Sequence, residues 1–177
     1  MRKGLIAAAV AAALGPMAVL ADDISYSYVD LDYLSVNPEG APSEDGFGLA
    51  GSFSIADNIH LFADYAGLDS LDQTSFGVGY HTNGDVSFFG NLSFVSLNPD
   101  GFPSEDGFGI EGGARGFFSD ELEWQASVAY INVDSGDDTS FNLGVRYHIN
   151  DMASVGVFAG FGDDSNQYGV GLRYSFD

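Results

Sequence analysis

The sequence predicts an all-β fold: a closed, antiparallel, up-and-down transmembrane β-barrel of ten strands, with an apolar exterior and a polar lumen. Three observations predict it. Large apolar residues alternate with small or polar ones along most of the chain, short turns interleave with longer acidic loops, and the charges inside the strands fall on one face. Eight strands are the alternative. We expect such a barrel in the cell outer membrane of a Gram-negative bacterium, where barrels of this inverted polarity occur.

The chain opens with the pattern of a secretory signal peptide. A basic start is followed by an apolar, Ala-rich run to Leu20, and an acidic pair comes directly after Ala21. We therefore expect residues 1–21 to be cleaved and residues 22–177 to form the barrel as a single domain. No later segment approaches the ~20 consecutive apolar residues of a membrane helix, so membrane crossing is expected from strands.

The expected strands follow in chain order. The strand near 24–36 is the least regular, because Tyr26 and Tyr28 fall on the face opposite Tyr33. The strand near 46–56 alternates strictly between large apolar residues and glycine, alanine or serine. The next three strands are expected near 59–68, 73–82 and 86–97.

The second half of the chain repeats this organisation. Residues 33–48 return with few changes as residues 94–109, and the Thr-Ser-Phe and Tyr-His pairs near 73–82 return near 139–149. The hairpin is therefore the duplicated unit, and a water-soluble sandwich or solenoid is the alternative explanation of such repeats. The last five strands are expected near 107–117, 122–133, 139–149, 153–162 and 167–176.

The connections between these strands alternate in length. Short turns at 57–58, 82–85, 119–121 and 150–151 interleave with longer acidic loops at 37–45, 69–72, 98–106, 134–138 and 163–166. Short periplasmic turns and longer extracellular loops are typical of bacterial outer-membrane barrels.

Aromatic residues distinguish the membrane barrel from its soluble alternatives. A membrane barrel carries aromatic girdles on its lipid face. Each expected strand supplies one aromatic residue near its long-loop end, and this regularity favours ten strands over eight. The predicted girdle consists of Tyr33, Phe47, Tyr65, Phe76, Phe94, Phe108, Tyr130, Phe141, Phe161 and Tyr168.

The charges inside the strands provide a second, independent distinction. All of them have the parity opposite to the girdle residue of their strand, and so do His60, His81 and His148. An arginine on the lipid face costs about 2–4 kcal/mol at the membrane midplane, which explains the bias. We expect these charges to form a lumen ion-pair network, with Glu123 as its hub near the periplasmic end, built from Glu123, Arg115, Arg146, Arg173, Asp30, Asp32, Asp64 and Glu111.

The composition excludes several classes of function. The chain has 5 Lys and Arg against 26 Asp and Glu, a net charge of −21, so nucleic acid is not an expected partner. It has no cysteine, which excludes disulfides and thiolate chemistry. Its aromatic content of 14% is too high for a disordered chain of the same charge.

The number of strands limits the width of the lumen. Eight strands leave an interior just wide enough for side chains, whereas open porins need sixteen or more. We expect a packed lumen and a non-enzymatic envelope protein with a structural or surface-interaction role. A narrow porin-like channel for ions or small solutes is the alternative, and a lipid-modifying enzyme is a third hypothesis. No catalytic residues are predicted, because the three histidines lie at the periplasmic ends of their strands.

Several motifs resemble a known family. Asp-Ile-Ser-Tyr-Ser-Tyr-Val-Asp over residues 23–30, Asp-Asn-Ile-His-Leu-Phe over 57–62, and two Gly-Val-x-Tyr-His strand ends carry the resemblance. The chain resembles a family of small, opacity-type outer-membrane barrels of Gammaproteobacteria, first described as a secreted elicitor of plant immunity and a quorum signal. The resemblance covers most of the mature chain and implies an outer-membrane barrel without catalytic residues. Asp177 departs from the usual barrel pattern, which ends on an aromatic residue.

The acidic loops predict the partners of the barrel. They hold many carboxylates and no base, which is typical of a solvated surface. The sharper hypothesis is a rim that binds Ca²⁺ and bridges to lipopolysaccharide, with Asp134, Asp137 and Asp138 as the metal candidate, because Ca²⁺ takes six to eight oxygen ligands. No other cofactor is expected. The remaining expected partners are outer-membrane lipid and, during biogenesis, the barrel-assembly machinery.

Overall fold

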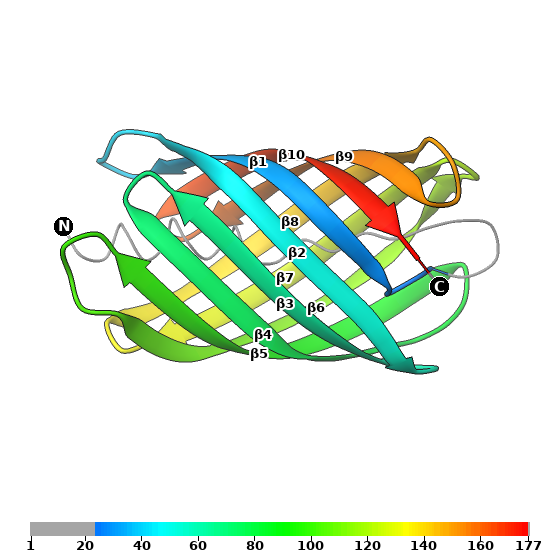
Figure 1. Cartoon of the computed structure of the whole chain (residues 1–177), viewed down its shortest axis with the longest axis horizontal. Helices are drawn as coiled ribbons and strands as arrows, with labels where there is room; N and C mark the ends of the chain where they lie inside the picture. The colour runs from blue at the N-terminus through cyan, green and yellow to red at the C-terminus, as the bar shows by residue number, and fades with distance from the viewer. Residues whose placement is uncertain (1–23, 177) are drawn as a thin grey trace.

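The computed structural model describes residues 24–176, which form ten antiparallel strands closed into a barrel (Figure 1). Strand order around the barrel follows chain order, and β1 closes the sheet by pairing with β10. The predicted fold class and strand number are confirmed. The strands are β1 (Tyr28–Pro38), β2 (Glu44–Ala56), β3 (Ile59–Leu68), β4 (Leu71–His81), β5 (Val86–Pro99), β6 (Glu105–Ser119), β7 (Leu122–Val133), β8 (Gly136–His148), β9 (Ala153–Gly162) and β10 (Ser165–Ser175).

The two ends of the described chain meet at one end of the barrel, where Tyr28 pairs with Ser175. The expected signal peptide (1–21) and the terminal Asp177 lie outside the described residues. The first strand begins at Tyr28, so residues 24–27, expected as strand, precede the sheet without strand pairing. Within the described range, no helix has the length and apolar character needed to cross a membrane.

The connections at the opposite end are shorter than the sequence predicted. For example, Val133 pairs with Gly136, which leaves two residues between β7 and β8 in place of the expected loop. Pairing extends because it satisfies backbone N–H and C=O groups that an irregular loop would leave to water. The prediction of long loops is therefore wrong at most of these positions, and the five connections cover residues 39–43, 69–70, 100–104, 134–135 and 163–164.

The two copies of the repeated motif adopt the same loop conformation. Gly40 and Gly101 occupy the left-handed region, with φ of 74° and 77°, where glycine is favoured. In each copy a serine hydroxyl donates to an asparagine across the loop, from Ser43 to Asn37 at 2.6 Å and from Ser104 to Asn98 at 2.5 Å. The duplication seen in the sequence is thus a duplication of structure.

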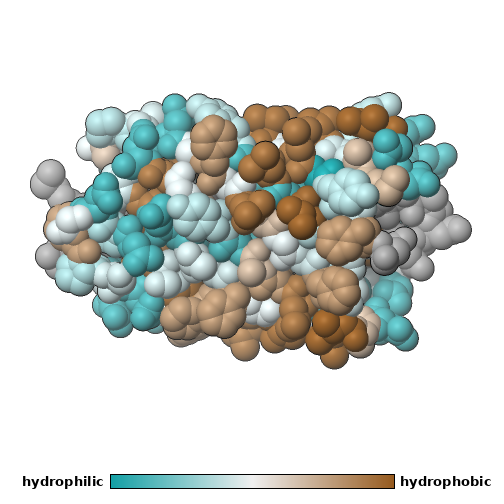
Figure 2. All heavy atoms as spheres, viewed as in Figure 1, coloured by the Kyte–Doolittle hydropathy of each residue, from teal (hydrophilic) through white to brown (hydrophobic). Residues whose placement is uncertain are grey.

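The exterior of the barrel is apolar around its middle. Figure 2 shows hydrophobic residues gathered over the centre of one face and hydrophilic ones towards the two ends. The predicted girdle residues lie on this outer face: nine of the ten have 42–64% of their surface exposed, and Tyr130 is half-buried. Several are edge-on or tilted neighbours, such as Tyr33 and Phe47 with ring centroids 5.6 Å apart. A water-soluble barrel would bury these side chains, so the predicted apolar exterior is confirmed.

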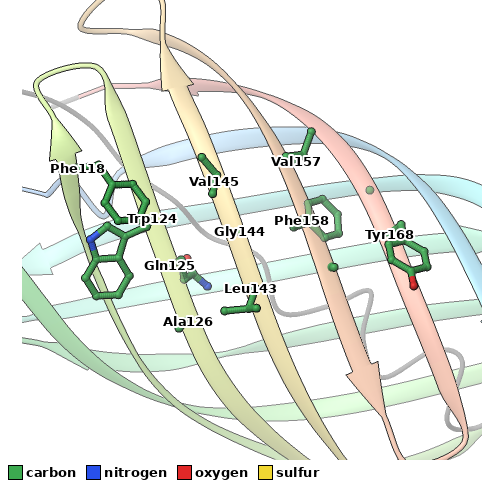
Figure 3. Close-up of a pocket in the computed structure, with 12 residues that line it drawn as sticks. Phe118, Trp124, Gln125, Ala126, Leu143, Gly144, Val145, Val157, Phe158 and Tyr168 are labelled. Atoms are coloured by element: carbon green, nitrogen blue, oxygen red, sulfur yellow. The ribbon is translucent and has the colours of Figure 1, made fainter.

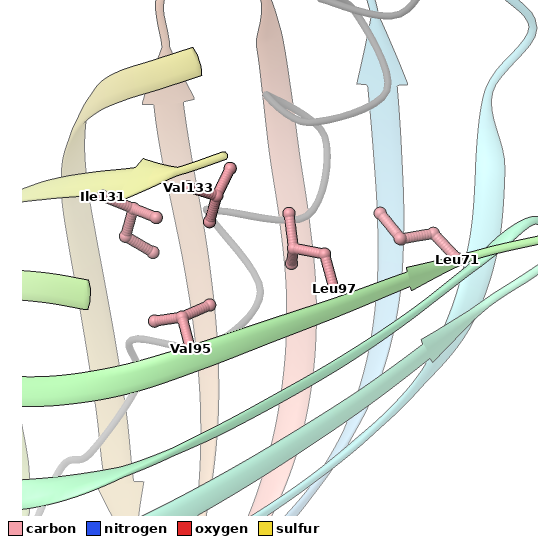
Figure 4. Close-up of a cluster of buried hydrophobic side chains, with 5 residues drawn as sticks. All are labelled: Leu71, Val95, Leu97, Ile131 and Val133. Atoms are coloured by element: carbon pink, nitrogen blue, oxygen red, sulfur yellow. The ribbon is translucent and has the colours of Figure 1, made fainter. Parts of the chain in front are cut away.

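The interior is polar over most of its length but has an apolar cluster towards each end. The cluster at the loop end comprises Leu71, Val95, Leu97, Ile131 and Val133 (Figure 4). The cluster at the end where the termini meet comprises Ile24, Tyr26 and Phe89, with Phe117 packed against them. The expectation of a lumen filled with polar, glycine and charged residues is therefore incomplete, because aliphatic and aromatic side chains also close both ends.

Candidate functional site in the barrel lumen

The candidate site is the lumen, because the charged side chains of the predicted network all point into it. Strand alternation places them opposite the lipid face, and seven of the eight predicted network residues are buried. The eighth, Asp64, is partly buried and accepts a hydrogen bond from the Ser75 hydroxyl at 2.9 Å. The structure brings the three arginines of the network to two separate carboxylates.

The first carboxylate is that of Glu123 on β7. Arg115 on β6 donates to Glu123 Oε1 from Nε at 3.1 Å and from Nη2 at 3.0 Å. On the other side, His148 Nε2 lies 3.0 Å from Glu123 Oε2. The side chains of Glu123, Arg115 and His148 are all fully or almost fully buried, so all three groups are shielded from solvent.

The strand pairing that produces this contact differs from the expected one. A three-residue turn centred on Ser119 would place Arg115 directly opposite Glu123. The turn is instead residues 120–121, with Ser119 opposite Leu122, and a bulge between Phe117 and Ser119 sets Glu123 opposite Phe117, so Glu123 reaches Arg115 diagonally. Between β7 and β8, Glu123 faces Arg146, and His148 is the diagonal neighbour, the reverse of the expectation. Long side chains reach both positions, so the contacts form despite the altered register.

The second carboxylate is that of Asp30 on β1. Arg173, its direct partner on β10, donates from Nε to Asp30 Oδ1 at 2.8 Å and makes a second contact through Nη2. Arg146 Nη2 lies 3.6 Å from Asp30 Oδ2. The prediction that Glu123 is the single hub is therefore wrong. Asp30 lies deeper towards this end than a strand beginning near residue 24 would place it, because β1 begins at Tyr28, and Asp30 and Arg173 are each two residues from the terminal Tyr28–Ser175 pair.

An aromatic stack fills the lumen beside the Glu123 group. The Tyr26 ring lies nearly parallel to the His81 ring, with centroids 3.7 Å apart, and 4.7 Å from the His60 ring. The Arg115 guanidinium lies 4.8 Å from the Tyr26 ring centroid, a cation–π distance. The sequence contains a signal for this arrangement, because Tyr26 and Tyr28 have the parity of lumen-facing residues. In the sequence this parity appears only as an irregularity of the first strand.

The histidines continue into a chain of polar contacts. His60 Nδ1 lies 3.1 Å from His81 Nδ1, and His60 Nε2 lies 3.1 Å from Asn91 Oδ1. The Asn91 amide then donates to Glu111 Oε2 at 2.8 Å. His81 and His148, which occupy equivalent repeat positions, thus have different partners, so the duplication did not preserve the role of this residue.

The predicted calcium candidate does not assemble as a cluster. Asp137 and Asp138 are consecutive residues of β8 and point to opposite faces, with Asp137 exposed and Asp138 only 2% exposed. Asp138 accepts a hydrogen bond from the Asp163 backbone N–H at 3.0 Å. Over residues 24–176, no group of three or more His, Asp or Glu side chains is placed to hold a metal ion.

The loop-end carboxylates instead connect neighbouring hairpins. Glu44 accepts hydrogen bonds from Ser70 through its backbone N–H at 3.2 Å and its hydroxyl at 2.6 Å. The equivalent residues of the second repeat, Glu105 and Ser135, make the same hydroxyl contact. These contacts join the end of one hairpin to the next around the rim.

A groove of about 550 Å³ lies outside the lumen, on the outer wall formed mainly by β7 to β10 (Figure 3). Its lining is apolar and includes Trp124, Leu143, Val157 and Tyr168. The groove lies within the apolar belt, so its surroundings are those of the lipid-facing wall.

The comparisons with known proteins identify the fold and no family. No protein-family model matches the chain, and no curated protein matches it. Among solved structures, the KdgM porin is 17% identical with a TM-score of 0.52, and the alignment covers 84% of this chain and 99% of that one. The NanC porin is 8% identical with a TM-score of 0.50, covering 85% and 100%. The likeness confirms that this chain shares the β-barrel fold of these outer-membrane porins.

Proposed function

We propose that this chain is a non-enzymatic outer-membrane barrel with a closed lumen, which serves the envelope as a structural or surface-interaction protein. The observation that carries the proposal is the filling of the lumen. Arg146 of β8 reaches Asp30 of β1, and Tyr26, which precedes β1, reaches the opposite wall at β5 and β6. We expect side chains that interlock across the barrel, with their charged groups buried, to block a diffusing solute.

The histidines support a structural role and not a catalytic one. His60, His81 and His148 are buried and packed against other lumen side chains at the end where the termini meet. A hydrolytic or lipid-modifying site needs a base within reach of a substrate, and histidines that are buried and bonded to other lumen side chains do not offer one.

Conductance measurements in planar bilayers test the closed lumen. The purified chain, refolded and inserted, is expected to give no reproducible current steps at either polarity. Regular steps from independent preparations would contradict the proposal. Heat-modifiable migration on the same samples shows that the inserted protein is the folded barrel.

A narrow porin-like channel is the second candidate, favoured by the fold shared with the KdgM and NanC porins. The side-chain amides of Gln73 and Gln167 are buried in the lumen without a hydrogen-bond partner. Water molecules in the lumen would supply the missing hydrogen bonds. One KdgM structure is a complex with disordered oligogalacturonate, an acidic sugar. Here the five carboxylates of the predicted network outnumber its three arginines, so a channel through this lumen would prefer cations, and the reversal potential in a salt gradient would show it.

The exposed rim provides the surface through which we expect contact with the outer leaflet. Its carboxylates would repel an acidic polymer but could share divalent cations with lipopolysaccharide. Binding of Ca²⁺ to the folded state would raise the unfolding midpoint in detergent. Since Asp134 and Asp137 are exposed and Asp138 is buried, Asp134→Asn with Asp137→Asn would remove that rise, whereas Asp138→Asn would not.

A further inference from the structure

We propose that residues 24–27 form a stopper that closes the periplasmic mouth of the lumen and can leave it without unfolding the barrel. The proposal rests on the closed lumen proposed above. It assigns to Tyr26 the role of a tethered ligand, seated in a site that lumen residues build for an aromatic ring.

The contacts of Tyr26 show that this segment crosses the lumen instead of lining the wall. A wall residue of an antiparallel barrel contacts mainly the two neighbouring strands. Tyr26 contacts five strands that follow one another around the barrel from β2 to β6. Its partners are Ser52, His60, His81, Ser87 and Arg115.

The site around the Tyr26 ring is built for its chemistry. The His81 ring stacks on one face with an interplanar angle of 10°, and the Arg115 guanidinium approaches the ring. The Tyr26 hydroxyl shares a hydrogen bond of 2.9 Å with the Ser87 hydroxyl. Arg115 is itself held by Glu123, so the site is organised by strand residues and not by the stopper.

An apolar contact completes the closure. Ile24 packs with Phe89 of β5 and Phe117 of β6, next to the Tyr26 ring. Together these side chains occupy the end of the lumen where the two ends of the described chain meet, which the sequence predicts to be the periplasmic end.

The attachment of the segment is local. It belongs to no strand, and besides the Tyr26 hydroxyl it is bonded to the wall at three points. Ser52 Oγ donates to the Tyr26 carbonyl at 2.7 Å, the Phe176 N–H donates to the Ser27 carbonyl at 3.0 Å, and the Ser54 N–H donates to Ser27 Oγ at 3.2 Å. Segments without ladder pairing open at a lower free energy than the strands beside them. The barrel would stay closed by its strand pairs while the stopper leaves.

The lumen behind the stopper provides a reason for it to open. Arg115 Nη1, Arg173 Nη1 and Gln125 Oε1 are buried without a hydrogen-bond partner. A buried polar group without a hydrogen-bond partner destabilises the folded state. Water that enters the lumen when the stopper opens would bond to these groups and offset part of the stacking energy that Tyr26 loses.

Thiol labelling tests the stopper directly, because the chain has no cysteine and any introduced one is unique. Ser127→Cys places a thiol in the lumen on β7, and Ser119→Cys places one on the exposed periplasmic turn. With a charged, water-soluble methanethiosulfonate reagent on the full folded chain, Ser127→Cys should label at least tenfold more slowly than Ser119→Cys. Adding Tyr26→Ala should raise the Ser127→Cys rate at least tenfold.

Three further variants separate opening from general damage. Tyr80→Ala removes an exposed tyrosine of the outer wall and should leave the rate unchanged. Tyr26→Phe keeps the stacked ring and should change the rate less than threefold. Ser52→Ala releases the Tyr26 carbonyl without touching the ring, and should speed labelling even where Tyr26→Ala does not fold, as judged by heat-modifiable migration.

The outcomes distinguish the two proposals. Slow labelling in every folded variant would overturn the stopper and leave the closed lumen standing. Labelling of Ser127→Cys as fast as Ser119→Cys, without any change at Tyr26, would overturn the closed lumen and the stopper with it.

Discussion

At the scale of the residue, the lumen is organised by two buried carboxylates that serve different arginines. Glu123 holds Arg115 and His148, and Asp30 holds Arg173 and Arg146. Burying a charge is unfavourable unless a partner and hydrogen bonds replace water. The barrel therefore depends on each group being complete, and the two groups are separable by mutation.

The Glu123 group should show strong coupling in a double-mutant cycle. Removing one partner of a buried pair typically costs about 3–5 kcal/mol, because the other charge is left uncompensated. Glu123→Ala should therefore lower the free energy of unfolding more than Asp64→Ala, whose carboxylate has a serine partner. Adding Arg115→Ala to Glu123→Ala should cost little more.

Urea unfolding from phospholipid vesicles measures these differences. The control pair is Arg173→Ala with Glu123→Ala, because Arg173 pairs with Asp30. Those two effects should add to within about 0.5 kcal/mol. Additivity of Arg115→Ala with Glu123→Ala would show instead that water solvates each charge separately.

Sharp curvature makes some inward glycines irreplaceable. A Cβ at Gly77 would lie 2.1 Å from the Leu92 carbonyl oxygen, a backbone atom that cannot move aside. Gly77→Ala is therefore expected to lower the free energy of unfolding by about 1–3 kcal/mol, as overpacking does. Gly112→Ala is the control, because its nearest atom lies 4.0 Å away, and similar losses for both variants would argue against steric crowding as the cause.

At the scale of the element, hairpins are joined at the rim by carboxylate–serine contacts that the duplication preserved. Glu44 with Ser70 and Glu105 with Ser135 occupy equivalent repeat positions. Strand alternation and repeats were sufficient to predict the ten strands. The loop lengths and the rim contacts were not predictable from the sequence. A polar segment at the end of a hairpin can extend the strand pairing or remain a loop, and the neighbouring hairpin decides which.

The rim contacts should order the short connections. Removing the Ser70 hydroxyl with Ser70→Ala, or the Glu44 charge with Glu44→Gln, should destabilise by about 1 kcal/mol, within the range for a hydrogen bond to a charged group at a partly exposed site. Amide hydrogen exchange at residues 69–70 should accelerate in both variants. Glu39→Gln, an exposed loop carboxylate, should leave that exchange unchanged, and an equal acceleration there would point to the net charge of the rim as the cause.

At the scale of the whole molecule, inside and outside were predictable because they depend on parity alone. The inward parity of Arg115, Arg146 and Arg173 required no knowledge of which strands pair at which register. The partners of Arg146 and Arg173 did require it, because both meet Asp30 across the β1–β10 closure. Arg115 meets Glu123 as predicted, although a bulge near Ser119 makes the contact diagonal. Tyr26 lay beyond prediction for a further reason, since its site exists only when five strands have closed around it.

The inverted polarity of the barrel leads to a depth-dependent prediction along one face of one strand. Val157 and Phe161 both point outward from β9, but Val157 lies near the middle of the apolar belt and Phe161 near the loop end. An arginine facing lipid costs about 2–4 kcal/mol at the midplane and about 0–1 kcal/mol near the interface. Val157→Arg should therefore reduce the fraction of heat-modifiable, membrane-inserted protein and lower the urea midpoint, and Phe161→Arg should do so much less. In a water-soluble barrel an arginine at Val157, 60% exposed, would be neutral, so equal tolerance at the two depths would mean that this wall does not face lipid.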